Sequence, residues 1–291
     1  MSVYVYGIAR DDHPALPERM EGVGDPPRAV RTVREGGLAA VVSDCPEDLR
    51  PRRRDLLAHQ QVLTETAAAD VVLPLRFGSV SADEDTVRSV LSEHSEHYRG
   101  QLAELEGCVE YNVKAAHHEE AVLHQVLEEE PGVRRLSAAN QAAGGGTYQD
   151  RIRLGELVAE AVRQREERDA RRVEEALAPH AERHCPGPEG QGWLANLCLL
   201  VRQVPRAPGG AQDPQASEAS EEEPQPSAQS RQDGAEGLLA AVDRLREANP
   251  QLDVRVSGPL PPYSFVIQPV AADAPPPGGP EQPQRPQQYA G

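Results

Sequence analysis

The stretch VSGPLPPYSFVIQP, residues 256–269, decides how the C-terminal part of the chain folds. It lies between a charged helical pattern and a Pro/Gln-rich tail, yet it contains Tyr263 and Phe265 in a chain that is only 3% aromatic. Gly258 permits a sharp exit from the preceding strand, and the prolines that follow stiffen an extended turn. The alternation of Tyr263, Phe265 and Ile267 then predicts a last edge strand, where proline is best tolerated. Both aromatic side chains are expected to anchor this segment in the core, and burial of Phe265 would contribute about 1.5 to 3 kcal/mol.

Strand and helix patterns alternate through the first half of the chain. Apolar runs at residues 3–9 (VYVYGIA), 38–43 (LAAVVS) and 71–80 (VVLPLRFGSV) predict buried strands. An amphipathic helix over residues 52–70 is expected to pack on them. Its predicted inward stripe consists of Leu56, Leu57, Gln60, Leu63 and Ala67.

A second amphipathic helix follows the third of these runs. A capping box from Ser81 to Glu84 predicts its start, and Gly107 predicts its end. Residues 108–115 (CVEYNVKA) then alternate like a half-exposed strand. Together these patterns predict an N-terminal α+β domain over residues 1–139, in which helices pack on one sheet. The inward face of the second helix is predicted to carry Val87, Val90, Leu91, Tyr98, Leu102 and Leu105.

The second half of the chain predicts another α+β layer, joined to the first by helices. A helix over residues 118–130 precedes a glycine-rich joint at 140–149. A C-terminal domain over residues 150–270 then begins with a long helix over 150–180, whose charged half is expected to be solvated or to lie along a partner. The elements that complete this domain are a strand in residues 193–205, a helix over 233–250 with Leu238, Leu239, Val242 and Leu245 inward, and a strand over 252–258.

Two segments lack the apolar residues that a core requires. The insert at residues 206–233 is acidic and has no hydrophobic side chain larger than alanine, so it is expected to be disordered. The Pro/Gln-rich tail, residues 271–291, is expected to be disordered for the same reason.

Charge and hydropathy exclude several classes of partner. The net charge of −17 repels phosphate backbones and anionic lipids, so neither nucleic acid nor membrane is an expected partner. No signal sequence or membrane-spanning run is evident, and we expect a cytoplasmic protein. The four cysteines lack CxxC spacing and are predicted to be small core residues: Cys45, Cys108, Cys185 and Cys198.

Catalytic templates do not match this sequence. Gly144 to Gly146 lacks the following Lys and Ser/Thr of a phosphate-binding loop, and neither a GxGxxG nor a GxSxG motif is present. The expected protein is therefore not an enzyme and has no cofactor. One alternative is a metal- or ligand-binding regulatory module that uses His117, Glu120 and His124 along one helical stripe. The competing interpretation of that stripe is a solvated polar helix face.

Two further side chains have alternative interpretations. His59 lies beside the apolar stripe of its helix and is either a hydrogen-bonded core histidine or an acid/base group. Arg76 interrupts a buried apolar run, and an unpaired buried guanidinium is costly. It is expected either to form an ion pair or to bind a partner. The candidate carboxylates for an ion pair are Asp83, Glu84 and Glu110.

Several motifs together carry a resemblance to a known family. The segments VYVYGIA, AHQQVL, VLPLRFGSV, LEGCVEYNVKA, LANLCLLV and VSGPLPPYSFV occur in this order from residue 3 to about residue 268. They resemble the gas vesicle accessory proteins of the GvpL/GvpF family, and the combination of PLRFG with GPxPPYSF is the most specific part. Leu260 stands where the family usually has Trp, and the insert is longer and more acidic than is usual in the family.

The resemblance implies a non-enzymatic protein with two α+β domains, the second of them ferredoxin-like. It implies a role in gas vesicle assembly or as a minor vesicle component, located in the cytoplasm and at the gas vesicle. The implied partners are the small hydrophobic shell protein and other gas vesicle accessory proteins. We expect the shell protein to contact a face that includes Arg76 and Phe77, whereas Tyr263 and Phe265 are expected to be structural first and contact residues second.

Overall fold

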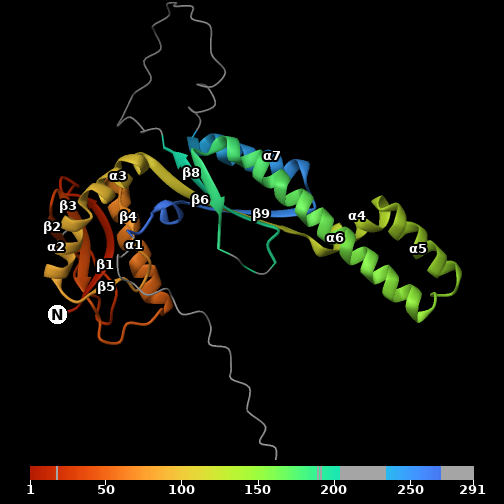
Figure 1. Ribbon diagram of the computed structural model, residues 1–291, viewed down its shortest axis with the longest axis horizontal. Coiled ribbons are helices and arrows are strands. Elements are labelled where there is room, and N and C mark those ends of the chain that lie inside the picture. The colour runs from red at the N-terminus through yellow and green to blue at the C-terminus, as the bar shows by residue number, and fades with distance from the viewer. Residues whose placement is uncertain (18, 189, 191, 204–233, 270–291) are drawn as a thin grey trace, which may run out of the picture.

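The computed structural model describes residues 1–17, 19–188, 190, 192–203 and 234–269. The predicted disordered insert and tail lie outside these residues. The described chain forms an elongated molecule, with one sheet at one end, a second sheet in the middle and a projecting helical arm at the other end (Figure 1).

The first sheet is antiparallel and has the strand order β2-β3-β1-β4, with β5 also pairing with β1. The helix α1 (Arg53–Ala69) covers one face, and the helices α2 (Glu84–Glu93) and α3 (Ser95–Leu105) cover the other. This double covering explains why β1 is buried along nearly its whole length. The strands are β1 (Val3–Arg10), β2 (Arg31–Glu35), β3 (Leu38–Asp44), β4 (Leu73–Pro74) and β5 (Val80–Ser81).

The buried face of α1 differs in part from the face that the sequence predicts. Leu56 and Leu57 are exposed, and the buried face of α1 instead includes Asp55, His59 and Thr66. Leu63 and Ala67 of the predicted stripe do pack in the core. Each of the buried polar groups has a hydrogen-bond partner, so it is buried at low cost, and hydrophobicity alone predicts only part of the buried face.

The second predicted helix is two helices, because the chain breaks at His94 between α2 and α3. The predicted capping box is also wrong. Asp83 caps α2 by accepting a hydrogen bond from the Thr86 amide at 2.8 Å, while Ser81 belongs to β5. Val90, expected inward, is exposed.

The second sheet is also antiparallel and has the order β7-β8-β6-β9. The helices α6 (Tyr148–Leu177) and α7 (Gly234–Ala248) pack on one face. With β6 as the first strand, the sequence β-α-β-β-α-β and the spatial order 4-1-3-2 define a ferredoxin-like layer, as predicted. Leu239 is exposed, whereas the other predicted inward residues of α7 are buried. The strands are β6 (Cys108–His117), β7 (Arg183–Pro186), β8 (Ala195–Arg202) and β9 (Leu252–Leu260).

The strand β6 was expected in the N-terminal sheet, and that expectation is wrong. It pairs with β8 along one side and with β9 along the other, so the change from the first sheet to the second falls between α3 and β6. Alternation along residues 108–115 predicts a strand but carries no information about which strands flank it. The division into domains at residue 139 stays a prediction.

The C-terminal segment is anchored in both layers, but it is not an edge strand. Residues Tyr263–Phe265 form a short 3-10 turn, η3. Phe265 is buried in the core that joins α2 and α3 to β8, and Tyr263 packs on the cluster beneath α1. Side chains, and not a neighbouring strand, satisfy the backbone here: Glu110 accepts from the Ser264 amide at 2.8 Å, and Gln101 bonds both backbone groups of Ile267 at 2.7 Å.

Gly258 is required at the start of this segment because no side chain fits there. A Cβ atom would lie 2.6 Å from the Tyr111 ring and 2.9 Å from the Glu110 carbonyl oxygen, and φ is +148°. The glycine thus permits β9 to stay close to β6 where the pairing is irregular.

Truncation of Phe265 is expected to destabilise the protein strongly. Phe265→Ala leaves a cavity in the shared core and should lower the free energy of unfolding by about 3 to 5 kcal/mol, measured by urea denaturation. Ile267→Ala, two residues away and exposed, is the matched control and should change it by less than about 0.5 kcal/mol. Equal effects of the two substitutions would contradict the anchoring role of Phe265.

Candidate functional site

The predicted contact residues Arg76 and Phe77 lie in the turn between β4 and β5. A hydrogen-bond chain beneath the turn holds it in place. The Gly78 amide donates to the Tyr4 hydroxyl at 3.1 Å, that hydroxyl is 2.9 Å from His59 Nδ1, and His59 Nε2 is 3.1 Å from the Leu75 carbonyl oxygen. Because the carbonyl only accepts, Nε2 carries the proton and Nδ1 accepts from Tyr4.

His59 is a hydrogen-bonded core histidine, one of its two predicted interpretations. Burial lowers its pKa, although the hydrogen bond to the Leu75 carbonyl opposes that shift. Burial likewise raises the pKa of Tyr4. Both groups are therefore neutral near pH 7, and they form a fixed support for the turn.

The aromatic residues of the predicted site have internal contacts. The ring of Phe77 lies 5.8 Å from the rings of both Tyr4 and His59, and Tyr263 packs on the same cluster. Phe265 lies in the other core, 5.5 Å from the Arg183 guanidinium. The structure thus brings Phe77 and Tyr263 to one cluster and places Phe265 elsewhere; their role in binding a partner stays a prediction.

Arg76 is exposed, so its guanidinium reaches water. Within the described residues it forms no ion pair with Asp83, Glu84 or Glu110. Glu84 instead pairs with Arg31, and Glu110 accepts from Ser264. The predicted ion pair is wrong, because the topology directs these carboxylates to other partners.

The predicted metal stripe does not form. His117 is the last residue of β6 and contacts Asp169, while Glu120 and His124 lie on α4 (Glu119–Glu129), where His124 contacts Glu128. Among the residues that the structure describes, no group of His, Cys, Asp or Glu side chains converges on a possible metal position. The prediction assumed that all three residues lie on one helix, but His117 ends a strand and only Glu120 and His124 are helical. The metal-binding alternative is therefore not favoured.

His117 belongs instead to a buried charge cluster at the base of the arm. Asp169 is fully buried and lies within 2.9 Å of His117, 3.4 Å of Arg165 and 2.7 Å of Arg172. Burial by itself raises the pKa of Asp169, but the hydrogen bond from His117 and the two arginine charges outweigh it and lower the pKa overall. Arg165 also pairs with Glu129, so the cluster ties α6 to α4 and to β6.

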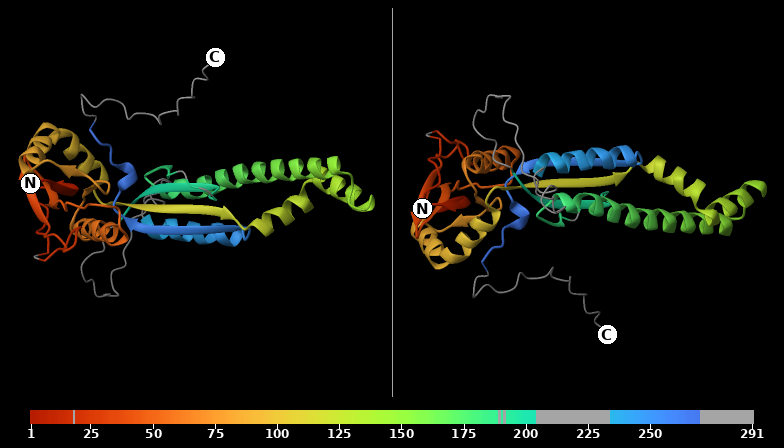
Figure 2. Two further views of the ribbon diagram at one scale, coloured as in Figure 1. Left: turned by 90° about the horizontal axis from the view of Figure 1, so that it is seen from below. Right: turned by 90° about the horizontal axis from the view of Figure 1, so that it is seen from above.

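The arm itself consists of α4, α5 (Pro131–Ala142) and the first half of α6, and it projects away from both sheets (Figure 2). The glycine-rich residues 144–146 lie in the turn between α5 and α6. The hydrophobic cluster that joins the helices of the arm has three buried members, Val126, Val133 and Ala161, with Leu154, Val158 and Val162 partly buried against it. A core this small leaves much of the apolar surface of the three helices uncovered.

An open apolar groove runs along the arm between α4 and α6. Its apolar lining comes from Leu123, Leu154, Val158 and Val162, and the groove has a volume of about 760 Å³. Gly155 is one of the lining residues, and a Cβ atom there would meet nothing within 4 Å beyond its chain neighbours and the backbone of its own helix. Helical periodicity does not predict this groove, since a hydrophobic pattern does not show whether another element covers it.

Two antiparallel sheets, each packed against helices, define the class of α+β protein to which this chain belongs. Solved gas vesicle proteins share this architecture. The crystal structure of GvpF from Anabaena sp. PCC7120 matches with a TM-score of 0.68 at 20% identity, over 92% of this chain and 99% of that chain. GvpF from Microcystis aeruginosa matches with a TM-score of 0.63 at 20% identity, over 91% of this chain and 98% of that chain.

Sequence comparison identifies the family. The profile described as "Gas vesicle synthesis protein GvpL/GvpF" matches residues 2–208 and 231–267. The chain is 52% identical to gas vesicle protein F of Streptomyces sp. (strain CB03234) over 91% of its own length and 100% of that protein. It is 29% identical to gas vesicle protein L1 of Halobacterium salinarum over 84% of its length and 82% of that protein. The chain belongs to the GvpL/GvpF family, as its motifs predicted.

Membership of this family ties the chain to gas vesicles. None of the helices in the described ranges has both the length and the apolar character that a membrane span requires.

The buried His59 predicts a specific dependence of stability on pH. Above pH 6.5, its unperturbed pKa, both the folded and the unfolded protein hold this imidazole neutral, and the stabilisation is complete. As the pH falls below 6.5, the unfolded chain takes up a proton that the folded protein does not bind until its lower pKa is reached, so stability is lost. Replacing His59 with Gln should remove this component, which is at most about 1.4 kcal/mol per pH unit.

Urea denaturation at several pH values between 5 and 7.5 measures this component. His124→Gln, at an exposed position, is the control and should leave the pH profile unchanged. If the free energy of unfolding of the wild type and of the His59→Gln variant changes in parallel with pH, His59 titrates alike in the folded and unfolded protein. That result would contradict the prediction.

Proposed function

We propose that this protein acts in gas vesicle assembly, or as a minor structural component of the vesicle, by binding the small hydrophobic shell protein. Family membership and the names of its relatives support a gas vesicle role. The observation that carries the binding function is the open apolar groove on the projecting arm.

The groove has the chemistry of a helix-binding site. Its lining is mainly apolar, with Arg151, Arg163 and Glu166 among the lining residues of α6 and Leu123 contributed by α4. A partner helix could lay an apolar face along it. Gly155 adds to this argument, since a helical glycine costs about 1 kcal/mol relative to alanine and no internal contact in the described structure requires it. The missing side chain leaves the groove open to a partner at this position.

Charge suits the same role. A net charge of −17 keeps copies of the protein apart and would keep a bound apolar subunit in solution. The charge alone does not select a partner, so the apolar groove must provide the specific contact.

The turn that carries Arg76 and Phe77 is a second candidate surface for the same partner. Arg76 is exposed at its tip, and the hydrogen-bond chain through Tyr4 and His59 holds it rigidly. Tyr263 supports this surface by packing in the same cluster as Phe77, whereas Phe265 anchors the C-terminal segment in the other core.

The proposed role includes contacts with other gas vesicle accessory proteins and is not catalytic. Identity favours the role of protein F: the chain is 52% identical to the F protein of Streptomyces sp. (strain CB03234) over most of its length, but 32% identical to the L protein of that strain over only 47% of its length.

Filling the groove should block binding of the shell protein. Gly155→Leu adds a side chain to the groove lining without a clash and with a gain in helix propensity, so the fold is expected to persist. Co-purification with the shell subunit, quantified by titration, should show affinity reduced about tenfold or more.

Two variants complete this test. Gly100→Leu, in α3 and equally free of neighbours, is the matched control and should bind normally. Arg76→Glu tests the turn as the second surface. Normal binding by Gly155→Leu with loss of binding by Arg76→Glu would move the contact to the turn, and absence of any association with the wild type would refute shell-protein binding.

A further inference from the structure

The strand β2 forms one edge of the first sheet, and its outward backbone groups can be assigned. The turn from β2 to β3 consists of Gly36 and Gly37, with φ of 59° and 76°, which is the two-residue hairpin that makes Glu35 and Leu38 a hydrogen-bonded pair. Along a strand, the backbone groups of successive residues point alternately toward and away from the neighbouring strand. Since those of Glu35 point toward β3, the N–H and C=O groups of Thr32 and Arg34 point away from it. Within the described residues, no other strand or loop hydrogen-bonds to them.

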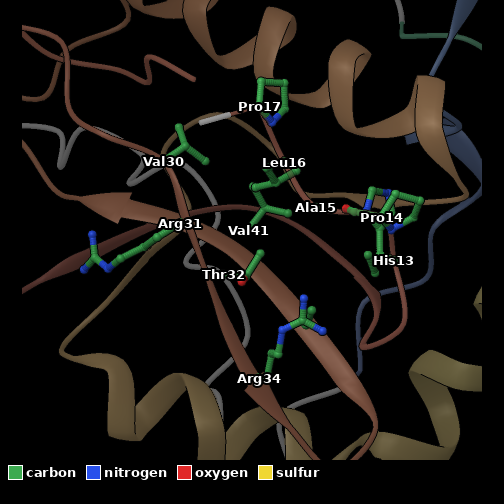
Figure 3. A pocket seen from close by; sticks show the side chains of 12 residues that line it. His13, Pro14, Ala15, Leu16, Pro17, Val30, Arg31, Thr32, Arg34 and Val41 are labelled. Atoms are coloured by element: carbon green, nitrogen blue, oxygen red, sulfur yellow. The ribbon is translucent and has the colours of Figure 1, made fainter. Parts of the chain in front are cut away.

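A pocket of about 340 Å³ lies beside this free edge, on the face to which Thr32 and Arg34 contribute (Figure 3). Its apolar wall includes Leu16, Val30 and Val41. The wall near His13 is fixed, because the two ring nitrogens lie 2.8 and 3.1 Å from the carbonyl oxygens of Pro14 and Thr66. A free strand edge next to a pocket for one side chain is the arrangement by which proteins bind extended peptides as an added strand.

The rim of the pocket carries an available positive charge in an otherwise acidic protein. Arg31 is already paired with Asp44 and Glu84, both at 2.9 Å. Arg34 is exposed and has no carboxylate partner in the part of the chain that the structure describes. A partner that places a carboxylate beside Arg34 would therefore form a new ion pair.

We propose that the β2 edge and this pocket bind an extended segment of a partner protein, with an apolar side chain in the pocket and an acidic residue beside Arg34. This interaction surface is separate from both the groove on the arm and the turn that carries Arg76. It would let the protein hold another component while the groove is occupied.

A second copy of the chain does not meet these requirements. An antiparallel β2–β2 pair centred on Val33 would place Thr32 opposite Arg34 of the other copy, so neither Arg34 would gain a carboxylate and no apolar side chain would enter the pocket. Two chains of charge −17 also repel each other.

A defined peptide tests the proposal. The probe is a fluorescein-labelled octapeptide of the repeat Val-Ser-Asp-Ser, in which valine and aspartate lie two residues apart and so share one face of the added strand. It is titrated into the full-length protein and followed by fluorescence anisotropy. We expect saturable binding, with at least tenfold weaker binding of the same peptide carrying lysine in place of aspartate. Arg34→Glu should weaken binding of the aspartate peptide at least fivefold, and Arg168→Glu, the same charge change on exposed α6, should have no effect.

Amide hydrogen exchange distinguishes strand addition from attraction of charge alone. Peptide binding should slow exchange at the Thr32 and Arg34 amides at least fivefold and leave the Val33 amide unchanged, because Val33 already bonds to β3. The proposal is overturned by any of three results: equal binding of both peptides or of neither, binding without protection of Thr32 and Arg34, or protection of these amides in a peptide-free dimer.

Discussion

The buried carboxylate of Glu110 constrains how the two layers meet. It lies on β6, is 1% exposed, and accepts hydrogen bonds from both the amide and the hydroxyl of Ser264 at 2.8 Å. A buried carboxylate without partners would be very costly, so the C-terminal segment must return to this point of the second sheet. That return places Phe265 in the core that joins the layers and Tyr263 beneath α1.

This arrangement joins the two sheets through one core and leaves the proposed binding surfaces at the periphery. One core includes residues of the first sheet, of α2 and α3, and of β8, so the two sheets share buried surface. The arm is different: it has a core of three buried side chains, and the Asp169 cluster attaches it to the second sheet. The arm at one end and the free strand edge at the other are the places where the two proposed partner contacts lie.

The residues of the candidate surfaces differ in how far sequence could locate them. The motif PLRFG gave the family, but it was predicted as part of one buried strand, whereas Arg76 lies in a turn between β4 and β5. The state of Arg76 was not predictable either, because its ion pairing depends on where Glu84 and Glu110 find other partners. The apolar residues of α6 follow helical periodicity, whereas the partial burial of Leu154 and Val158 depends on how α4 and α5 pack against them. The β2 edge was missed altogether, since RTVRE has a single buried residue, Val33, and no apolar alternation.

By itself, the sequence determined the α+β class, the family, most helices and strands, and the anchoring role of Phe265, because these depend on local periodicity and on motifs that are read along the chain. Only the tertiary structure decided that β6 belongs to the second sheet, that Asp55 and His59 face inward while Leu56 faces out, and that Tyr263 to Phe265 form a turn. The physical reason is common to all three. Strand neighbours and the hydrogen-bond partners of buried polar groups are distant in sequence, and no local pattern records them.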